Sequence, residues 1–188
     1  MALRVKTRWN DKDKTRSIQD TASALAFNQW RTAQNILLNL ENEGFQTDTY
    51  QDRLAIMQEL VSFLIHVTDR VAYERMDEDE RAAFIMALAK KHADYMQDNA
   101  RDVLGPGDHR TPFIEVLNQR LDDLSEFGFA DMEPSFQMTR FFGDSVTEVV
   151  GDRQKKWVTT QIIDIEVPEM MRTMKRLFQT FLPEMPAQ

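Results

Sequence analysis

Cysteine is absent from this chain of 188 residues, and glycine and proline are scarce, with six of each. Because there is no thiol, the chain can form no disulfide, iron–sulfur cluster or thiolate zinc site, and it has no cysteine nucleophile. The lack of cysteine is also compatible with a reducing compartment. The scarcity of glycine and proline leaves room for long helices and disfavours a β fold, which needs many turns.

Long apolar runs are lacking too, and none approaches the ~20 residues that a membrane-spanning helix needs. Residues 1–16 contain no apolar stretch of the kind found in a secretory signal, and Asp11 and Asp13 argue against a transit peptide. Hydrophobic residues nevertheless make up 42% of the chain, which is enough for a folded core. We therefore expect a soluble cytoplasmic protein with a single domain.

Positive charge is concentrated at the N-terminal end. The chain has a formal net charge of −8, but residues 1–16 contain six basic and two acidic residues, a local balance of +4 that leaves −12 for the rest. An acidic body disfavours nonspecific binding to nucleic acid, because neutralised phosphates supply most of that affinity. We predict a basic N-terminal arm at 1–16, a helical bundle domain at 17–183 and a C-terminal tail at 184–188. The arm is expected to be solvated or packed on the acidic body; in the alternative, Trp9 anchors it on an anionic partner.

Apolar residues recur with helical spacing over most of residues 17–182. This pattern predicts an all-α fold, a single-domain irregular bundle of five to seven amphipathic helices. The second helix has the widest apolar arc and is expected at the centre of the bundle. Asp48 or Thr49 is the predicted N-cap of the second helix and Asp77 that of the third. Thr111, which precedes a proline, is the predicted N-cap of the fourth. The predicted helices cover 17–42, 49–76, 77–104, 111–127 and 134–150, with a last helical stretch from 157 to 182.

The stretch 157–167 is rich in β-branched residues and has two interpretations. On propensity alone it forms a strand, paired with residues 145–150 in a hairpin. A helix is favoured because the flanking patterns are helical and Val158, Ile162 and Ile165 share one helical face. Pro168 then either kinks that helix or starts a new one.

His92 is the most informative residue of the chain, because it occupies the middle of an apolar helical face. Asn99 follows one heptad later on that face, and Gln29 lies within the apolar arc of the first helix. Buried polar groups need hydrogen-bond partners. We therefore predict a buried polar network of His92, Asn99 and Gln29 that fixes the register of the helices, in preference to a metal ligand or a catalytic base. The apolar residues that define the face are Ile85, Leu88, Ala89, Met96 and Val103.

A metal centre is the sharpest alternative for a helical bundle of this kind. A ferritin-like di-metal site uses the motif Glu-x-x-His on two of its helices, and the motif does not occur here. The nearest set is His66 and Asp69, three residues apart, with Glu59 two turns earlier. These residues belong to the polar face of the second helix, where they are expected to be solvated or paired. No cofactor is therefore predicted, and a metal ion with oxidoreductase-type activity belongs to the alternative interpretation.

The loop at 105–112 precedes the N-terminus of a helix, where free backbone amides can bind an anion. His109 and Arg110 would assist such binding. The glycine spacing of the loop is not that of a phosphate-binding motif, so a simple connection is the favoured interpretation. No Gly-x-Ser-x-Gly motif occurs, and no catalytic residue is predicted.

The absence of a convergent catalytic set favours a non-enzymatic protein that acts through protein–protein contacts, as a homodimer. The expected interface includes the second apolar face of the first helix, with Phe27 and Leu38. The stripe near the C-terminus is the other candidate, although methionines at helical spacing more often fill a core. The stripe consists of Met170, Met174, Leu177, Phe178 and Phe181.

Overall fold

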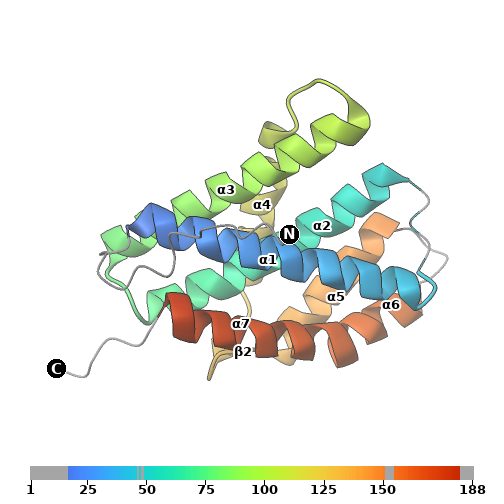
Figure 1. Cartoon of the computed structure of the whole chain (residues 1–188). Helices are drawn as coiled ribbons and strands as arrows, with labels where there is room; N and C mark the ends of the chain where they lie inside the picture. Colours follow the sequence, from blue (N-terminus) through green and yellow to red (C-terminus); the bar gives the residue numbers. More distant parts are fainter. Residues whose placement is uncertain (1–16, 46, 48, 151–154, 183–188) are drawn as a thin grey trace, which may run out of the picture.

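A computed structural model describes residues 17–45, 47, 49–150 and 155–182. The described residues form an irregular helical bundle with one very small β hairpin (Figure 1), so the predicted all-α fold is confirmed. The predicted arm at 1–16, with Trp9, and the predicted tail at 184–188 lie outside the described residues. The elements are α1 (Ile18–Asn42), α2 (Tyr50–Tyr73), α3 (Glu78–Leu104), α4 (Arg110–Ser125), β1 (Phe129–Ala130), β2 (Glu133–Pro134), α5 (Phe136–Val150), α6 (Lys155–Gln161), η3 (Ile162–Glu166) and α7 (Val167–Phe181).

The N-termini of the first helices are capped by side chains that the sequence identifies. Ser17 accepts a hydrogen bond from the backbone N–H of Asp20 at 3.1 Å. Thr49 and Asp52 form a reciprocal capping box. Asp77 accepts from the N–H of Glu80 at 2.9 Å. The predicted caps Thr49 and Asp77 are confirmed.

Helix α2 is the centre of the bundle, as its wide apolar arc predicts. It packs against α1, α3, α4 and α5. Ile56, Leu60, Leu64 and Val67 are fully buried along it. Phe63 stacks on Phe142 of α5 with ring centroids 4.2 Å apart. Figure 1 shows α1 between α3 and α7, so α1 has packed faces toward both and toward α2.

Residues 155–181 form one continuous helical run, which confirms a helix rather than a hairpin at 157–167. Its middle, η3, is a π-helical segment in which the N–H of Val167 donates to the carbonyl of Ile162, five residues earlier. Pro168 follows at once and has no N–H to donate to an earlier carbonyl. The helix therefore widens before the proline and continues through it.

The hairpin of β1 and β2 was not predicted. The predicted helix started at about Pro134, but this residue belongs to β2 and α5 begins at Phe136. Phe129 pairs with Pro134, and Ala130 pairs with Glu133. Asp131 and Met132 form the turn with positive φ angles of 53° and 58°. Two-residue strands show no alternation of apolar and polar residues, so their sequence carries no strand signal. Within the described residues, no helix is both long and apolar enough to cross a membrane.

Candidate functional site

A fully buried polar network joins the three central helices. The Nε2 atom of His92 on α3 lies 2.8 Å from Oε1 of Gln29 on α1. The side-chain amide of Gln29 donates to Oγ1 of Thr68 at 2.7 Å and to the carbonyl of Leu64 at 3.2 Å, both on α2. Because the amide oxygen of Gln29 only accepts, Nε2 of His92 carries the proton. The network fixes α1 and α3 against the central helix.

The imidazole of His92 is held in its neutral form. Its burial lowers the pKa from 6.5 to about 3. The ring lies among aromatic side chains, 6.4 Å from the ring of Trp30 and 6.1 Å from that of Tyr95. Among the residues that the structure describes, its Nδ1 atom has no hydrogen-bond partner. His92 therefore has the surroundings of a structural histidine, with one strong bond to an amide and an apolar environment elsewhere.

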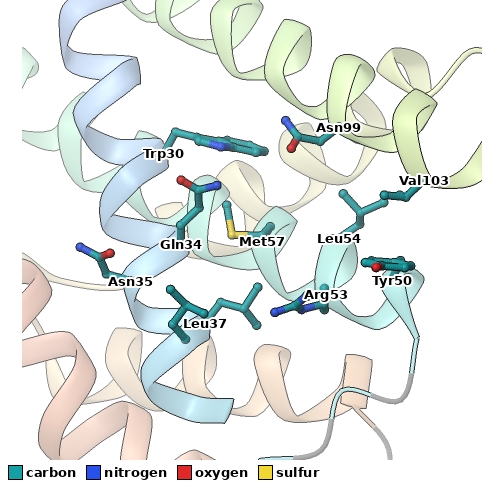
Figure 2. Close-up of a pocket in the computed structure, with 11 residues that line it drawn as sticks. Trp30, Gln34, Asn35, Leu37, Tyr50, Arg53, Leu54, Met57, Asn99 and Val103 are labelled. Atoms are coloured by element: carbon teal, nitrogen blue, oxygen red, sulfur yellow. The ribbon is translucent and has the colours of Figure 1, made fainter. Parts of the chain in front are cut away.

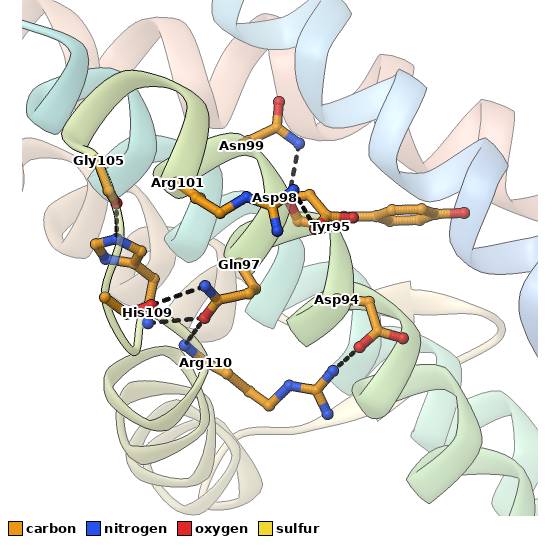
Figure 3. Close-up of polar contacts among 10 residues, drawn as sticks. Asp94, Tyr95, Gln97, Asp98, Asn99, Arg101, Gly105, His109 and Arg110 are labelled. Atoms are coloured by element: carbon orange, nitrogen blue, oxygen red, sulfur yellow. Dashed lines mark hydrogen bonds and ion pairs between the residues drawn. The ribbon is translucent and has the colours of Figure 1, made fainter.

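Asn99 does not belong to this network, which corrects the sequence analysis. Its side chain is exposed and donates to the carbonyl of Tyr95 at 2.7 Å (Figure 3). The buried face of α3 follows Leu88, His92, Met96 and Ala100, at intervals of four residues. Asn99 lies only ~20° from His92 around the helix. It is exposed because, near the C-terminal end of α3, the space beside α1 and α2 is an open groove that Asn99 helps to line.

A surface groove lies beside the buried network, between α1, α2 and the C-terminal part of α3. We call it the Trp30 groove; it has a volume of about 400 Å³ (Figure 2). Trp30 is almost buried at its floor, and its indole ring also contacts the ring of His92. The walls combine apolar side chains, several of them exposed, with the free amide of Gln34. Its principal lining residues are Trp30, Gln34, Leu38, Tyr50, Leu54 and Val103.

Glu59 and His66 were expected on an exposed polar face of the second helix, but both side chains are buried. Each is only 3% exposed, because α4 packs over this side of α2. Arg120 of α4 binds both carboxylate oxygens of Glu59, at 2.7 and 3.1 Å. Sequence periodicity missed this burial because the compensating arginine comes from another helix.

The other residues of the proposed metal set are also bound to arginines. Asp69 pairs with Arg81 at 2.8 Å. Nε2 of His66 accepts from Arg70 at 3.3 Å. Burial, and then the charge of Arg70, lower the pKa of His66 to about 4. In the part of the chain that the structure describes, no three His, Cys, Asp or Glu side chains are grouped so as to hold a metal ion. The Asp69–Arg81 pair joins α2 to α3, whereas the bond between Arg70 and His66 lies within α2.

The amides at the start of α4 already have acceptors, so the alternative of an anion site at His109 and Arg110 has no free amides to use, and the loop is the connection that was favoured. Oε1 of Gln97 accepts from their backbone N–H groups at 2.8 and 3.0 Å (Figure 3). Asp108 accepts from the N–H groups of Arg110 and Thr111, both at 3.0 Å. The guanidinium of Arg110 pairs with Asp94. Thr111 was predicted as the N-cap, but α4 begins two residues earlier than expected, with His109 as its N-cap residue, and Asp108 supplies the capping carboxylate.

The C-terminal stripe is mostly part of the core, as the favoured interpretation of its methionines expects, and does not form the alternative interface. Met170, Met174 and Phe178 are each at most 1% exposed. The second apolar face of α1 does reach the surface, where Phe27 is 53% and Leu38 is 49% exposed. Of the two predicted surfaces, the one on α1 has the more exposed apolar side chains, because Leu177 and Phe181 of the C-terminal stripe are partly buried.

A second cavity was missed by the sequence analysis. It lies between α1 and the η3–α7 segment, with a volume of about 430 Å³, and we call it the Glu166 pocket. Glu166 lines it although its side chain is only 1% exposed. The sequence feature that could have indicated this pocket is an acidic residue, Glu166, between Ile162 and Val167, which are both buried. Asn35 and Leu38 line this pocket and the Trp30 groove alike.

The structure thus brings together only part of the predicted site residues. His92 and Gln29 are joined by a hydrogen bond, whereas Asn99 lies apart from them.

Comparison of the chain with protein-family models, with curated proteins and with solved structures finds no match. The function is therefore inferred from the contacts of this chain.

Proposed function

We propose that this protein is a non-enzymatic helical module that acts through protein–protein contacts, as a homodimer built on α1. The observation that carries the proposal is a straight row of outward side chains on α1, the α1 stripe, which adjoins the Trp30 groove. Two of its members are large apolar residues with about half of their surface exposed. The α1 stripe consists of Phe27, Arg31, Gln34 and Leu38.

The α1 stripe is complementary to a second copy of itself. Phe27 and Leu38 are eleven residues apart on one helix, which corresponds to about 16 Å along its axis. In an antiparallel pair of α1 helices related by a two-fold axis, Phe27 of each copy faces Leu38 of the other. Arg31 then faces Gln34, whose amide oxygen accepts from a guanidinium. A two-fold interface requires this kind of self-complementary surface.

The Trp30 groove adds a cavity next to the row. Gln34 and Leu38 belong both to the α1 stripe and to the lining of the groove. An aromatic side chain from a second copy would therefore have an apolar depression beside its contact row. Buried aromatic anchors in such depressions dominate the energy of many protein interfaces.

The proposal includes a cytoplasmic location, which the absence of cysteine supports. The alternative function, a metal-dependent oxidoreductase, has no support from the contacts of the predicted ligands. Glu59 and Asp69 are each bound to an arginine, and His66 accepts from a third. A metal ion would have to displace all these cations.

Sedimentation velocity over a dilution series tests the proposal. The wild-type chain is expected to dissociate from dimer to monomer on dilution. Leu38→Glu would place a carboxylate against Phe27 twice in each dimer, and is expected to raise the dissociation constant at least about a hundredfold.

Phe136→Glu is the matched control, since Phe136 is also exposed but lies on α5, away from the α1 stripe. It is expected to leave the dissociation constant unchanged. A wild-type chain that stays monomeric at the highest concentration would refute the homodimer. Equal effects of the two substitutions would refute the placement of the interface on α1.

A further inference from the structure

The Glu166 pocket contains a carboxylate whose hydrogen bonds are incomplete. Its two partners are the side-chain amide of Gln161, at 3.2 Å, and that of Asn39, at 3.5 Å. Charge-assisted hydrogen bonds to a carboxylate are typically ~2.7–2.9 Å long, and an ionised carboxylate has about four acceptor positions. A side chain that is only 1% exposed cannot complete its bonding with bulk water. Glu166 therefore has unused acceptor capacity at the edge of a cavity.

No cation of the described chain neutralises this carboxylate. Its hydrogen bonds come from neutral amides, and no salt bridge includes it. The charged neighbours that act on it are Glu169 and Glu43, which both repel its charge. Desolvation by burial, followed by these weaker charge effects, raises the pKa of Glu166 against the lowering effect of the two amides. The pocket thus has negative charge and no internal counter-ion among the described residues.

The remaining walls of the pocket offer neutral polar groups. Asn35, Asn42 and Thr173 line it, and their side chains make no hydrogen bond in the described structure. Amide and hydroxyl oxygens accept hydrogen bonds from a cation without repelling it. Ile36 and Met170 provide an apolar floor. The volume of about 430 Å³ is within the range of small-molecule sites.

The backbone that carries Glu166 is unusual as well. Glu166 is the last residue of the π-helical segment η3. Short π-helical segments within α-helices frequently occur at functional sites. Pro168 accounts for the widening of this helix, so the π-helical segment explains how Glu166 is placed at the pocket and is not a separate sign of a site.

We propose that the Glu166 pocket binds one alkylammonium or alkylguanidinium group, with Glu166 as the charge partner and the asparagine side chains as additional acceptors. The cation belongs either to a free small molecule or to a lysine or arginine side chain of a second copy of this chain. The pocket and its carboxylate exist in the single chain, so binding of a free cation does not depend on the homodimer, whereas binding of a side chain of the second copy rests on that proposal.

Titration of the full chain with n-butylammonium and n-butylguanidinium, followed by NMR of the side-chain amides, tests the binding. The amide signals of Asn35 and Asn42 are expected to shift and saturate with either cation, and not with the neutral analogue 1-butanol. Glu166→Gln removes the charge with little change of shape, and is expected to weaken binding about ten- to a hundredfold. Glu148→Gln, an exposed site on α5, removes the same charge elsewhere and is expected to leave binding unchanged.

Sedimentation of the same two variants distinguishes the sources of the cation. If Glu166→Gln weakens both cation binding and dimer formation, the cation is a side chain of the second copy. If it weakens cation binding alone, the ligand is a free molecule. The proposal is overturned if neither butyl cation shifts the amides more than 1-butanol does. It is also overturned if Glu166→Gln, with an unchanged circular dichroism spectrum, binds the cations as tightly as the wild type. These two outcomes concern cation binding alone. The homodimer proposal is tested separately, by the sedimentation of Leu38→Glu.

Discussion

The bond between His92 and Gln29 can be tested by replacing each partner with an apolar residue. His92→Leu removes the N–H that lies 2.8 Å from Oε1 of Gln29 and leaves that oxygen without a donor in a fully buried position. An unsatisfied buried acceptor costs about 1–3 kcal/mol, and we expect the free energy of unfolding at pH 7.5 to fall by about that amount. Gln29→Met leaves the imidazole N–H unsatisfied and is expected to destabilise similarly. In the double variant Thr68 still donates to the carbonyl of Leu64, so the loss should be smaller than the sum.

The pH dependence of the same variants isolates the histidine. The pKa of His92 is about 3 in the folded chain, against 6.5 for a free histidine. Because the folded pKa is lowered, the stabilisation is complete above pH 6.5 and is lost as the pH falls from there toward 3. Between pH 7.5 and 5 the unfolded chain gains a proton that the folded chain does not, which lowers the free energy of unfolding by about 2 kcal/mol. His92→Leu lacks this contribution.

Urea denaturation followed by circular dichroism at pH 7.5 and at pH 5 gives the required free energies. The difference between the wild type and His92→Leu is expected to shrink by about 2 kcal/mol at the lower pH. The titration of His66 affects both chains equally and cancels in this difference. Parallel pH profiles would show that His92 titrates normally in the folded chain, and the reasoning from its burial would then be wrong.

Three other substitutions test separate contacts by urea denaturation. Arg120→Met leaves the buried carboxylate of Glu59 without its partner and is expected to cost about 3–5 kcal/mol, while the double variant with Glu59→Gln should recover much of it. Glu166→Gln is expected to raise stability at pH 7.5, and the gain should shrink as the pH falls toward 4.5, because a carboxyl with a raised pKa destabilises the fold only when it is ionised. Gly105→Ala meets no atom within 4 Å, yet the φ angle of 91° should make it cost about 1–3 kcal/mol. A neutral result for any of them would refute the contact or the backbone strain on which it depends.

Local sequence signals predicted the helices well, because their causes are local. The caps Thr49 and Asp77 lie next to the amides that they satisfy, and the apolar arc of α2 reflects its own burial. The same reasoning found His92 and Gln29, since each is a polar residue within an otherwise apolar face. Asn99 was misplaced because the neighbouring helices leave an open groove beside it, and periodicity along α3 carries no information about that groove.

The candidate surface sites could not be predicted in the same way, because their residues are far apart in the sequence. Glu59 is buried only because Arg120, sixty-one residues later, binds its carboxylate. Glu166 lines its pocket together with Asn39, which is 127 residues away. A polar residue is exposed or buried according to the helix that covers it, and periodicity along one helix carries no information about that neighbour.

Leu38 connects the two proposals, since its side chain lines both the Trp30 groove and the Glu166 pocket. Leu38→Glu and Leu38→Lys both introduce a charge into the α1 stripe, so each is expected to weaken dimer formation. Their effects on the Glu166 pocket should have opposite signs. An added carboxylate strengthens the attraction for n-butylammonium, and an added ammonium group opposes it, each by about three- to tenfold at low salt. Titrations of the two variants measure this difference, and it should decrease as salt is added. Equal affinities in the two variants would separate the cation site from this edge of α1 and would contradict the shared wall that the geometry assigns to it.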